Sequence, residues 1–171
     1  MVNREKTHIT SVGRGVAFLG FVICPKHISI HPKRVKRFKD RVRQKSHRNS
    51  GLPVEQMVLR LNPFLRGWIS CFRLANCKTL VEDLMGWIRA QRAPDLRMKQ
   101  MREWKGWKAL HRELRRRGYQ GKFQKISMRR WRNSASPLLN MALPSQWFEE
   151  IGLVDLTRYE VGTLHRYYEV A

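Results

Sequence analysis

The fold is decided by a stretch that reads NPFLRGWISCF at positions 62–72. Its apolar residues recur at spacings of three and four, which is typical of one face of an α-helix, and they include Leu65, Trp68 and Phe72. Asn62 and Pro63 have the form of an N-cap followed by a first helical residue, so we expect a new helix to begin there. We expect this helix to form the centre of the hydrophobic core.

Further helices are expected on both sides of this stretch. Pro32 is suited to a first helical turn, and Val35, Phe38 and Val42 then form one apolar stripe in a helix over residues 32–48. Another helix should open at Pro53. Downstream, the spacing of Thr79 and Glu82 predicts a capping box, in a helix that ends before Pro94. Gly118 is placed to close the last helix of this part of the chain.

The N-terminal part is predicted to contain strands. Residues 16–23 form one apolar run rich in β-formers, and residues 28–30 alternate after a turn that contains Pro25. The predicted fold class is therefore mainly α, a helical bundle with one small N-terminal β-hairpin. We expect three parts: an N-terminal segment and hairpin (residues 1–31), a helical domain (32–118), and a C-terminal extension packed on it (119–171).

The charge of the chain indicates a polyanionic partner. The 171 residues include 35 Lys or Arg and 13 Asp or Glu, which gives a formal charge of +22. Residues 1–50 and 94–132 are strongly basic, and they flank a less charged block at 51–93, whereas residues 133–171 are mildly acidic. Such segregation favours nucleic-acid-facing surfaces around a packing centre.

Two basic clusters are the strongest candidates for phosphate contacts. The helix expected at 32–48 has one acidic residue, Asp40, among many cations, and Tyr119, Phe123 and Trp131 lie between the cations of the second cluster. These aromatic rings could stack on unpaired bases, although core packing is an equally good interpretation for Trp131. Trp68, Trp87 and Trp104 are expected mainly in the core. Arg66 should project from a different helix face than Leu65, toward solvent or RNA, unless an intramolecular ion pair holds it. The candidate RNA-binding residues are Lys33, Arg34, Lys36, Arg37, Lys39, Arg41, Arg43, Lys45, Arg66, Arg115, Arg116, Arg117, Lys122, Lys125, Arg129, Arg130, Trp131 and Arg132.

No enzyme site is recognisable in the sequence. There is no phosphate-binding glycine loop, and the acidic pair Glu82–Asp83 is better explained by helix capping than by metal binding. Cys71 and Cys77 lack the further close ligands of a structural zinc site, so we expect neither a metal nor a cofactor. Three cysteines do not suggest a disulfide framework, no apolar run is long enough to span a membrane, and no secretory signal opens the chain. We expect a cytoplasmic protein, most simply a bacterial one.

Several motifs in order resemble the maturase domain of group II intron reverse transcriptases. The first is Glu5-Lys6-Thr7, followed by Phe18-Leu19-Gly20-Phe21. Positions 62–72 resemble the family phrase N-x-x-L-R-G-W-x-N-Y-F, with Ser70 and Cys71 in place of Asn and Tyr. The distal motifs are Arg112-Glu113-Leu114, Gly118, Arg130-Trp131-Arg132-Asn133-Ser134-Ala135, Leu139-Asn140, Ala142-Leu143-Pro144, Phe148 and Gly152-Leu153. The resemblance covers roughly residues 5–155.

The resemblance implies a helical thumb and maturase portion that binds intron RNA and assists its folding for splicing and mobility. The Asp-Asp pair of the family's polymerase centre and the zinc ligands of its nuclease domain are absent from this sequence. We therefore expect a non-enzymatic protein that binds structured intron RNA, with the chemistry left to the RNA and its Mg²⁺ ions. Two alternatives stay open: the accessory half of a split reverse transcriptase, whose partner chain carries the polymerase palm, and a non-functional fragment of an intron-encoded protein.

Overall fold

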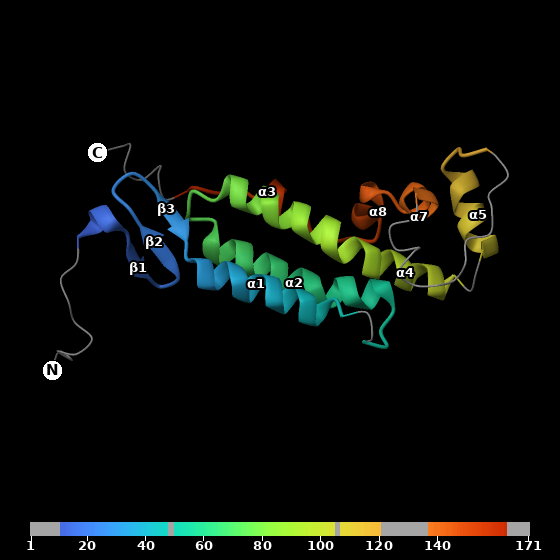
Figure 1. Cartoon of the computed structure of the whole chain (residues 1–171), viewed down its shortest axis with the longest axis horizontal. Coiled ribbons are helices and arrows are strands. Elements are labelled where there is room, and N and C mark those ends of the chain that lie inside the picture. The colour runs from blue at the N-terminus through green and yellow to red at the C-terminus, as the bar shows by residue number, and fades with distance from the viewer. Residues whose placement is uncertain (1–10, 48–49, 105–106, 121–136, 164–171) are drawn as a thin grey trace.

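A computed structural model describes residues 11–47, 50–104, 107–120 and 137–163. Figure 1 shows a small sheet at one end, long helices running lengthwise, and α5 (Trp107–Arg116) at the other end. The fold is mainly α with a small antiparallel sheet near the N-terminus, as predicted. None of the described helices is both long enough and apolar enough to cross a membrane.

The sheet has three strands where the sequence predicted a two-stranded hairpin. The strands β1 (Val16–Phe18), β2 (Phe21–Ile23) and β3 (Ile28–Ile30) pair in the antiparallel order β1-β2-β3 and follow a short 3₁₀ turn, η1 (Val12–Arg14). The run 16–23 was expected as one strand, and this was wrong because a tight turn divides it at Leu19 and Gly20. Both residues have positive φ, 49° and 95°, as two-residue hairpin turns of type I′ require.

Helix α1 (Pro32–Lys45) begins where the sequence predicted. His31 is its N-cap, and the Nδ1 atom of His31 accepts a hydrogen bond from the Lys33 N–H at 3.1 Å. Phe38 and Val42 are fully buried and Val35 packs against the core, so the predicted apolar stripe is confirmed.

Helix α2 (Val54–Phe72) runs without a break through Pro63, so the prediction of a new helix at Asn62–Pro63 was wrong. Asn62 does not cap a helix: its amide Nδ2 donates to the Gly152 carbonyl and its Oδ1 accepts from the Val154 N–H. Pro63 is exposed on the outer face beside Leu59, where water can reach the Leu59 carbonyl that lacks a helical N–H partner. The helix starts after Pro53, and a carboxylate oxygen of Glu103 accepts from the Val54 N–H at 2.9 Å.

The central part of α2 is the centre of the core, as predicted. Leu65 and Ile69 are fully buried, and Trp68 is 8% exposed. The Trp68 ring lies 4.5 Å from the ring of Phe38 and 5.1 Å from that of Phe72, measured between centroids. Trp68 therefore joins α1 to α2. Trp87 and Trp104, which were also expected mainly in the core, pack against it but are only partly buried.

Two further predictions fail in the helices that follow. Helix α3 (Lys78–Trp87) begins one residue before Thr79 and has no side-chain cap, so Thr79 and Glu82 form no capping box and Glu82–Asp83 lies beyond the first turn. The chain then continues through a π-turn, η2 (Ile88–Arg92), into α4 (Ala93–Glu103), rather than ending before Pro94. Pro94 has no N–H to donate, and the π-turn directly before it is the local departure from regular α-helix that accommodates it.

The C-terminal segment packs back along the long helices. Gly118 (φ 83°) closes α5 two residues after its last residue, and the Tyr119 N–H donates to the Leu114 carbonyl, so the predicted closure is confirmed. The remaining elements are α7 (Pro137–Ala142), α8 (Ser145–Glu150) and the 3₁₀ turn η3 (Leu156–Arg158). Pro144 is the N-cap residue of α8, and Gly152 follows the end of this helix.

Candidate nucleic-acid interface

The basic side chains of α1 fall into two rows, because residues three or four apart share one face of a helix. One row lies beside α3 and is called here the α3-facing row; it contains Lys36, Lys39 and Arg43. The other row is exposed and is called the outer row; it contains Arg34, Arg37 and Arg41. Asp40 separates the rows on the outside of the helix. The two remaining candidates on α1 are Lys33, which is exposed, and Lys45, which is half-buried.

The α3-facing row is engaged with Trp87 of α3. The Lys39 ammonium lies 5.5 Å from the Trp87 ring centroid, and the Arg43 guanidinium carbon lies 5.2 Å from it. Arg43 also donates to a carboxylate oxygen of Asp40 at 2.8 Å. A cation within about 6 Å of an indole ring is attracted by the ring quadrupole, so these two cations help to hold α1 against α3.

An open groove of about 560 Å³ runs between α1 and α3. Its floor is apolar and includes Ile30, Val35 and Leu80, whereas the α3-facing row and Asp40 form its edge. This row thus combines a structural role with a cationic edge.

The outer row has no acidic partner within the described part of the chain. Arg41 donates through Nη1 to the amide oxygen of Gln44 at 3.2 Å, and that partner is neutral. Arg34 lies over the β1–β2 turn, since a Cβ atom at Gly20 would come within 2.8 Å of its Nε atom. Three exposed guanidinium groups within two helical turns repel one another unless an anion compensates them. The outer row is therefore a candidate site for anionic groups.

The arginines at the end of α5 differ from one another. Arg117, whose side chain is 13% exposed, contacts Glu113 at 2.8 Å and Glu150 of α8 at 2.7 Å. Arg116 is 64% exposed and binds Glu113 through two hydrogen bonds of 2.8 and 2.6 Å. Arg115 is exposed and has no acidic partner among the described residues. Arg117 thus joins α5 to α8, and Arg115 is the member of this cluster that is free to contact an anion.

The pKa of Glu113 lies below its ordinary value, chiefly because the hydrogen bond from Arg116 favours the carboxylate and despite the opposing effect of burial. A group whose pKa is lowered by folding stabilises the protein above its unfolded-state pKa, and this contribution is lost as the pH falls.

We therefore expect the free energy of unfolding to decrease as the pH drops below about 4.5. Replacement of the carboxylate in Glu113→Gln should reduce that decrease by roughly 1 kcal/mol. Urea unfolding at pH 7 and pH 3.5 measures both quantities. Glu82→Gln, which removes an exposed carboxylate on α3, is the control and should leave the pH dependence unchanged; equal effects of the two variants would contradict the assignment.

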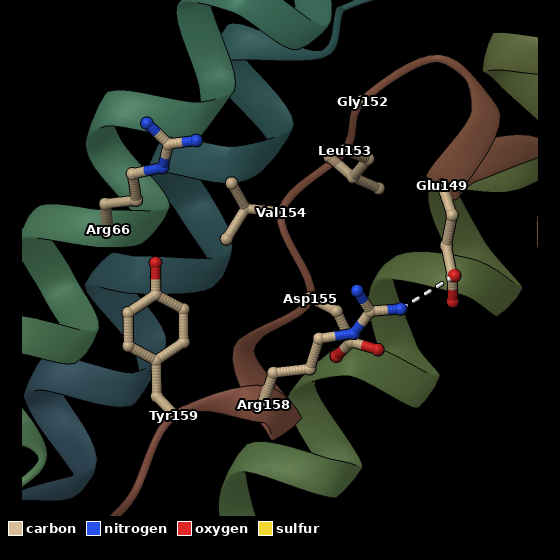
Figure 2. A pocket seen from close by; sticks show the side chains of 8 residues that line it. All are labelled: Arg66, Glu149, Gly152, Leu153, Val154, Asp155, Arg158 and Tyr159. Atoms are coloured by element: carbon tan, nitrogen blue, oxygen red, sulfur yellow. Dashed lines mark hydrogen bonds and ion pairs between the residues drawn. The ribbon is translucent and has the colours of Figure 1, made fainter.

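Arg66 projects from α2 away from the core, as predicted, and lines an open pocket of about 460 Å³ (Figure 2). The rest of the lining comes from residues 149–159 and includes the side chains of Val154, Arg158 and Tyr159. No carboxylate within the described residues forms an ion pair with Arg66, so the alternative of an intramolecular ion pair finds no support there. We call this cavity the Arg66 pocket.

The wall of the Arg66 pocket is a strap, residues 152–159, which is fixed to α2 and to the π-turn. Asn62 donates to the Gly152 carbonyl at 2.8 Å and accepts from the Val154 N–H at 3.0 Å. Asp155 binds Arg89 at 2.9 Å and caps η3 by accepting from Thr157. Burial raises the pKa of Asp155, but the hydrogen bonds from Thr157 and the charge of Arg89 outweigh that effect and leave it below its ordinary value. Asp155 therefore remains a carboxylate that holds the strap in place.

Several predicted site residues lie outside the described part of the chain: Lys122, Lys125, Arg129, Arg130, Trp131 and Arg132. Conversely, the structure places beside the candidate residues three side chains that sequence reasoning missed: Trp87 beside the α3-facing row, and Tyr159 and Arg158 at the Arg66 pocket. The helical spacing of Trp87 predicted a core residue, and nothing in the local sequence marks Tyr159.

Among the described residues, no three His, Cys, Asp or Glu side chains gather where they could hold a metal ion.

Comparison with known protein families identifies the helical part of this chain. Residues 35–118 match the model of the family described as group II intron, maturase-specific domain. The match begins within the apolar stripe of α1 and ends at Gly118, which closes α5. It thus includes the outer row from Arg37 onward, all of α2 with Arg66, and the arginines of α5. A search of curated proteins finds no relative that matches the chain. Residues 35–118 of this chain are therefore a group II intron maturase-specific domain.

Proposed function

We propose that this chain binds folded group II intron RNA and stabilises that fold, and so assists splicing and mobility of the intron. The observation that carries the proposal is the outer row of α1, where three exposed guanidinium groups stand without an acidic partner among the described residues. Planar guanidinium groups bind phosphate oxygens through paired hydrogen bonds, and single arginines of this kind position a protein on RNA without reading its sequence.

Two further features support binding to a folded RNA rather than to a flexible strand. The outer row is mounted on a helix whose inner side chains, Phe38 and Val42, are fully buried, so the cations have a fixed spacing. Arg115 provides a cationic group on α5, at the far end of the molecule from the sheet (Figure 1). Separated, rigidly mounted cations fit an RNA whose phosphates are themselves held at fixed positions. In this proposal the chemistry of splicing belongs to the RNA and its Mg²⁺ ions, and the protein supplies no acid, base or nucleophile.

The salt dependence of RNA binding tests the proposal. Contacts with at least four phosphates, at the outer row and Arg115, predict a slope of log K against log[salt] of about −3 or steeper. The affinity for a group II intron RNA should then fall roughly 60-fold between 50 and 200 mM salt. Titration of labelled RNA at four salt concentrations, with Mg²⁺ constant, measures the slope, and circular dichroism verifies that the protein remains folded. A slope shallower than about −1 would contradict phosphate binding by the outer row and Arg115.

A further inference from the structure

The Arg66 pocket is an open cavity that is large enough for a small ligand. Its volume of about 460 Å³ lies within the range of about 300–1,000 Å³ typical of small-molecule pockets. One wall comes from α2 and the opposite wall from the strap at residues 152–159, which follows the part of the chain that matches the maturase-specific family. The two walls are held together by the paired hydrogen bonds of Asn62. The pocket is therefore formed before any ligand arrives.

Its charges leave one cation available. Of the two carboxylates that line the pocket, Glu149 binds Arg158 at 2.8 Å, and Asp155 is engaged with Arg89 and Thr157. Arg66 is exposed and has no acidic partner within the described residues. Figure 2 shows the Arg158–Glu149 pair on one side of the pocket and Arg66 on the other. An anionic group is thus favoured at the Arg66 side, away from the two carboxylates.

The part of the pocket next to Arg66 is aromatic and aliphatic. Tyr159 is half-buried, and its hydroxyl end points toward the side where Arg66 lies (Figure 2). Val154 lies beside these two residues on the strap wall. A planar aromatic ring beside an unpaired guanidinium is the combination that proteins use for an unpaired nucleotide, whose base stacks on the ring while its phosphate binds the cation.

We infer that the Arg66 pocket takes a single unpaired nucleotide of the bound RNA, with its base against Tyr159 and its phosphate on Arg66. The inference rests on the proposed RNA-binding function and adds a second kind of contact to it. The outer row holds phosphates of any structured RNA, whereas the pocket selects RNA in which a nucleotide is unpaired and can leave its helix. It also gives the C-terminal strap a role in recognition.

Two hairpin RNAs provide the test. They have the same stem, and one carries a single bulged 2-aminopurine whereas the other contains 2-aminopurine in a fully paired stem. We expect the wild-type protein to bind the bulged hairpin roughly tenfold more tightly and to quench its fluorescence by stacking. Tyr159→Leu should abolish the preference, and Tyr159→Phe, which retains the ring, should keep it. Arg66→Gln should weaken binding of the bulged hairpin roughly tenfold, whereas Arg60→Gln, which removes an exposed cation from the same helix outside the pocket, should preserve the preference.

The outcomes separate the two proposals. If Tyr159→Leu melts like the wild type and still prefers the bulged hairpin, the pocket is not the nucleotide site. Equal binding of both hairpins by the wild type overturns the pocket and leaves the proposed function intact. Failure to bind either hairpin at low salt also overturns the pocket, and the proposed function is tested separately by the titration with intron RNA. Free adenosine monophosphate serves as a competitor. Displacement of the bulged hairpin by micromolar concentrations would show that the pocket serves a free nucleotide and would overturn the RNA-borne source.

Discussion

Trp68→Ala is expected to lower the free energy of unfolding by about 3–5 kcal/mol, the range found for truncation of large buried aromatic residues. Trp68 is 8% exposed and contacts the rings of Phe38 on α1 and Phe72 on α2. Its removal leaves a cavity at the point where these two helices meet. For a domain of marginal stability, a loss of this size unfolds a large fraction of the molecules. Chemical denaturation followed by tryptophan fluorescence and circular dichroism measures the change.

Arg66→Ala is the matched control, because Arg66 lies two residues earlier on the same helix and is exposed. It should shift the melting temperature by no more than a few degrees while weakening affinity for intron RNA, by roughly 1–2 kcal/mol for one charge-assisted bond to phosphate. If Arg66→Ala melts early and its folded fraction binds RNA normally, Arg66 is structural and does not contact RNA. Retention of wild-type stability by Trp68→Ala would contradict the placement of the core.

Substitution of all three outer-row arginines, Arg34, Arg37 and Arg41, by Gln should weaken binding to intron RNA by roughly 100-fold at low salt. Each arginine offers a charge-assisted bond to phosphate, and loss of three such contacts should also make the salt slope less steep by about 2–3. The fold should be retained because these side chains are exposed and make no ion pair among the described residues. Filter binding at several salt concentrations gives both the affinity and the slope.

The control for this variant removes the same amount of charge elsewhere. Arg60, Lys78 and Arg102 are exposed cations of α2, α3 and α4, and their joint replacement by Gln lowers the net charge equally. We expect a loss of only a few fold, from weaker long-range attraction. If both triple variants lose the same affinity, binding reflects the total charge of the chain and the outer row has no special role.

The sequence predicted the features that depend on neighbours along the chain. The stripe of Val35, Phe38 and Val42 repeats with the helical period, and burial of its last two members follows directly from that spacing. Gly118 was recognisable because a helix end needs a residue that tolerates positive φ. The exposed position of Arg66 follows from the same geometry that buries Leu65.

The failed predictions involve residues whose local preference is overruled by their surroundings in the fold, in some cases by contacts far away along the chain. Asn62 and Pro63 carry the signal of a helix start, but the Asn62 side chain is used by the strap about 90 residues later. Pro94 carries the signal of a helix end, and a preceding π-turn accommodates it. The Arg66 pocket was beyond sequence reasoning for the same reason, since its walls meet only in the folded chain. Similarly, Glu113 is visible as a neighbour of Arg117 at helical spacing, whereas Glu150 is not.

The central claim, that this chain recognises a folded group II intron, is tested most directly by comparing two RNAs at one salt and one Mg²⁺ concentration. One is a correctly folded group II intron, and the other is a shuffled RNA with the same length and base composition. Non-specific attraction of a protein with a formal charge of +22 acts equally on both, so the ratio of the two dissociation constants isolates recognition of the fold. The proposed function predicts that the folded intron binds at least about tenfold more tightly, a difference of about 1.4 kcal/mol. Equal dissociation constants for the two RNAs would contradict it.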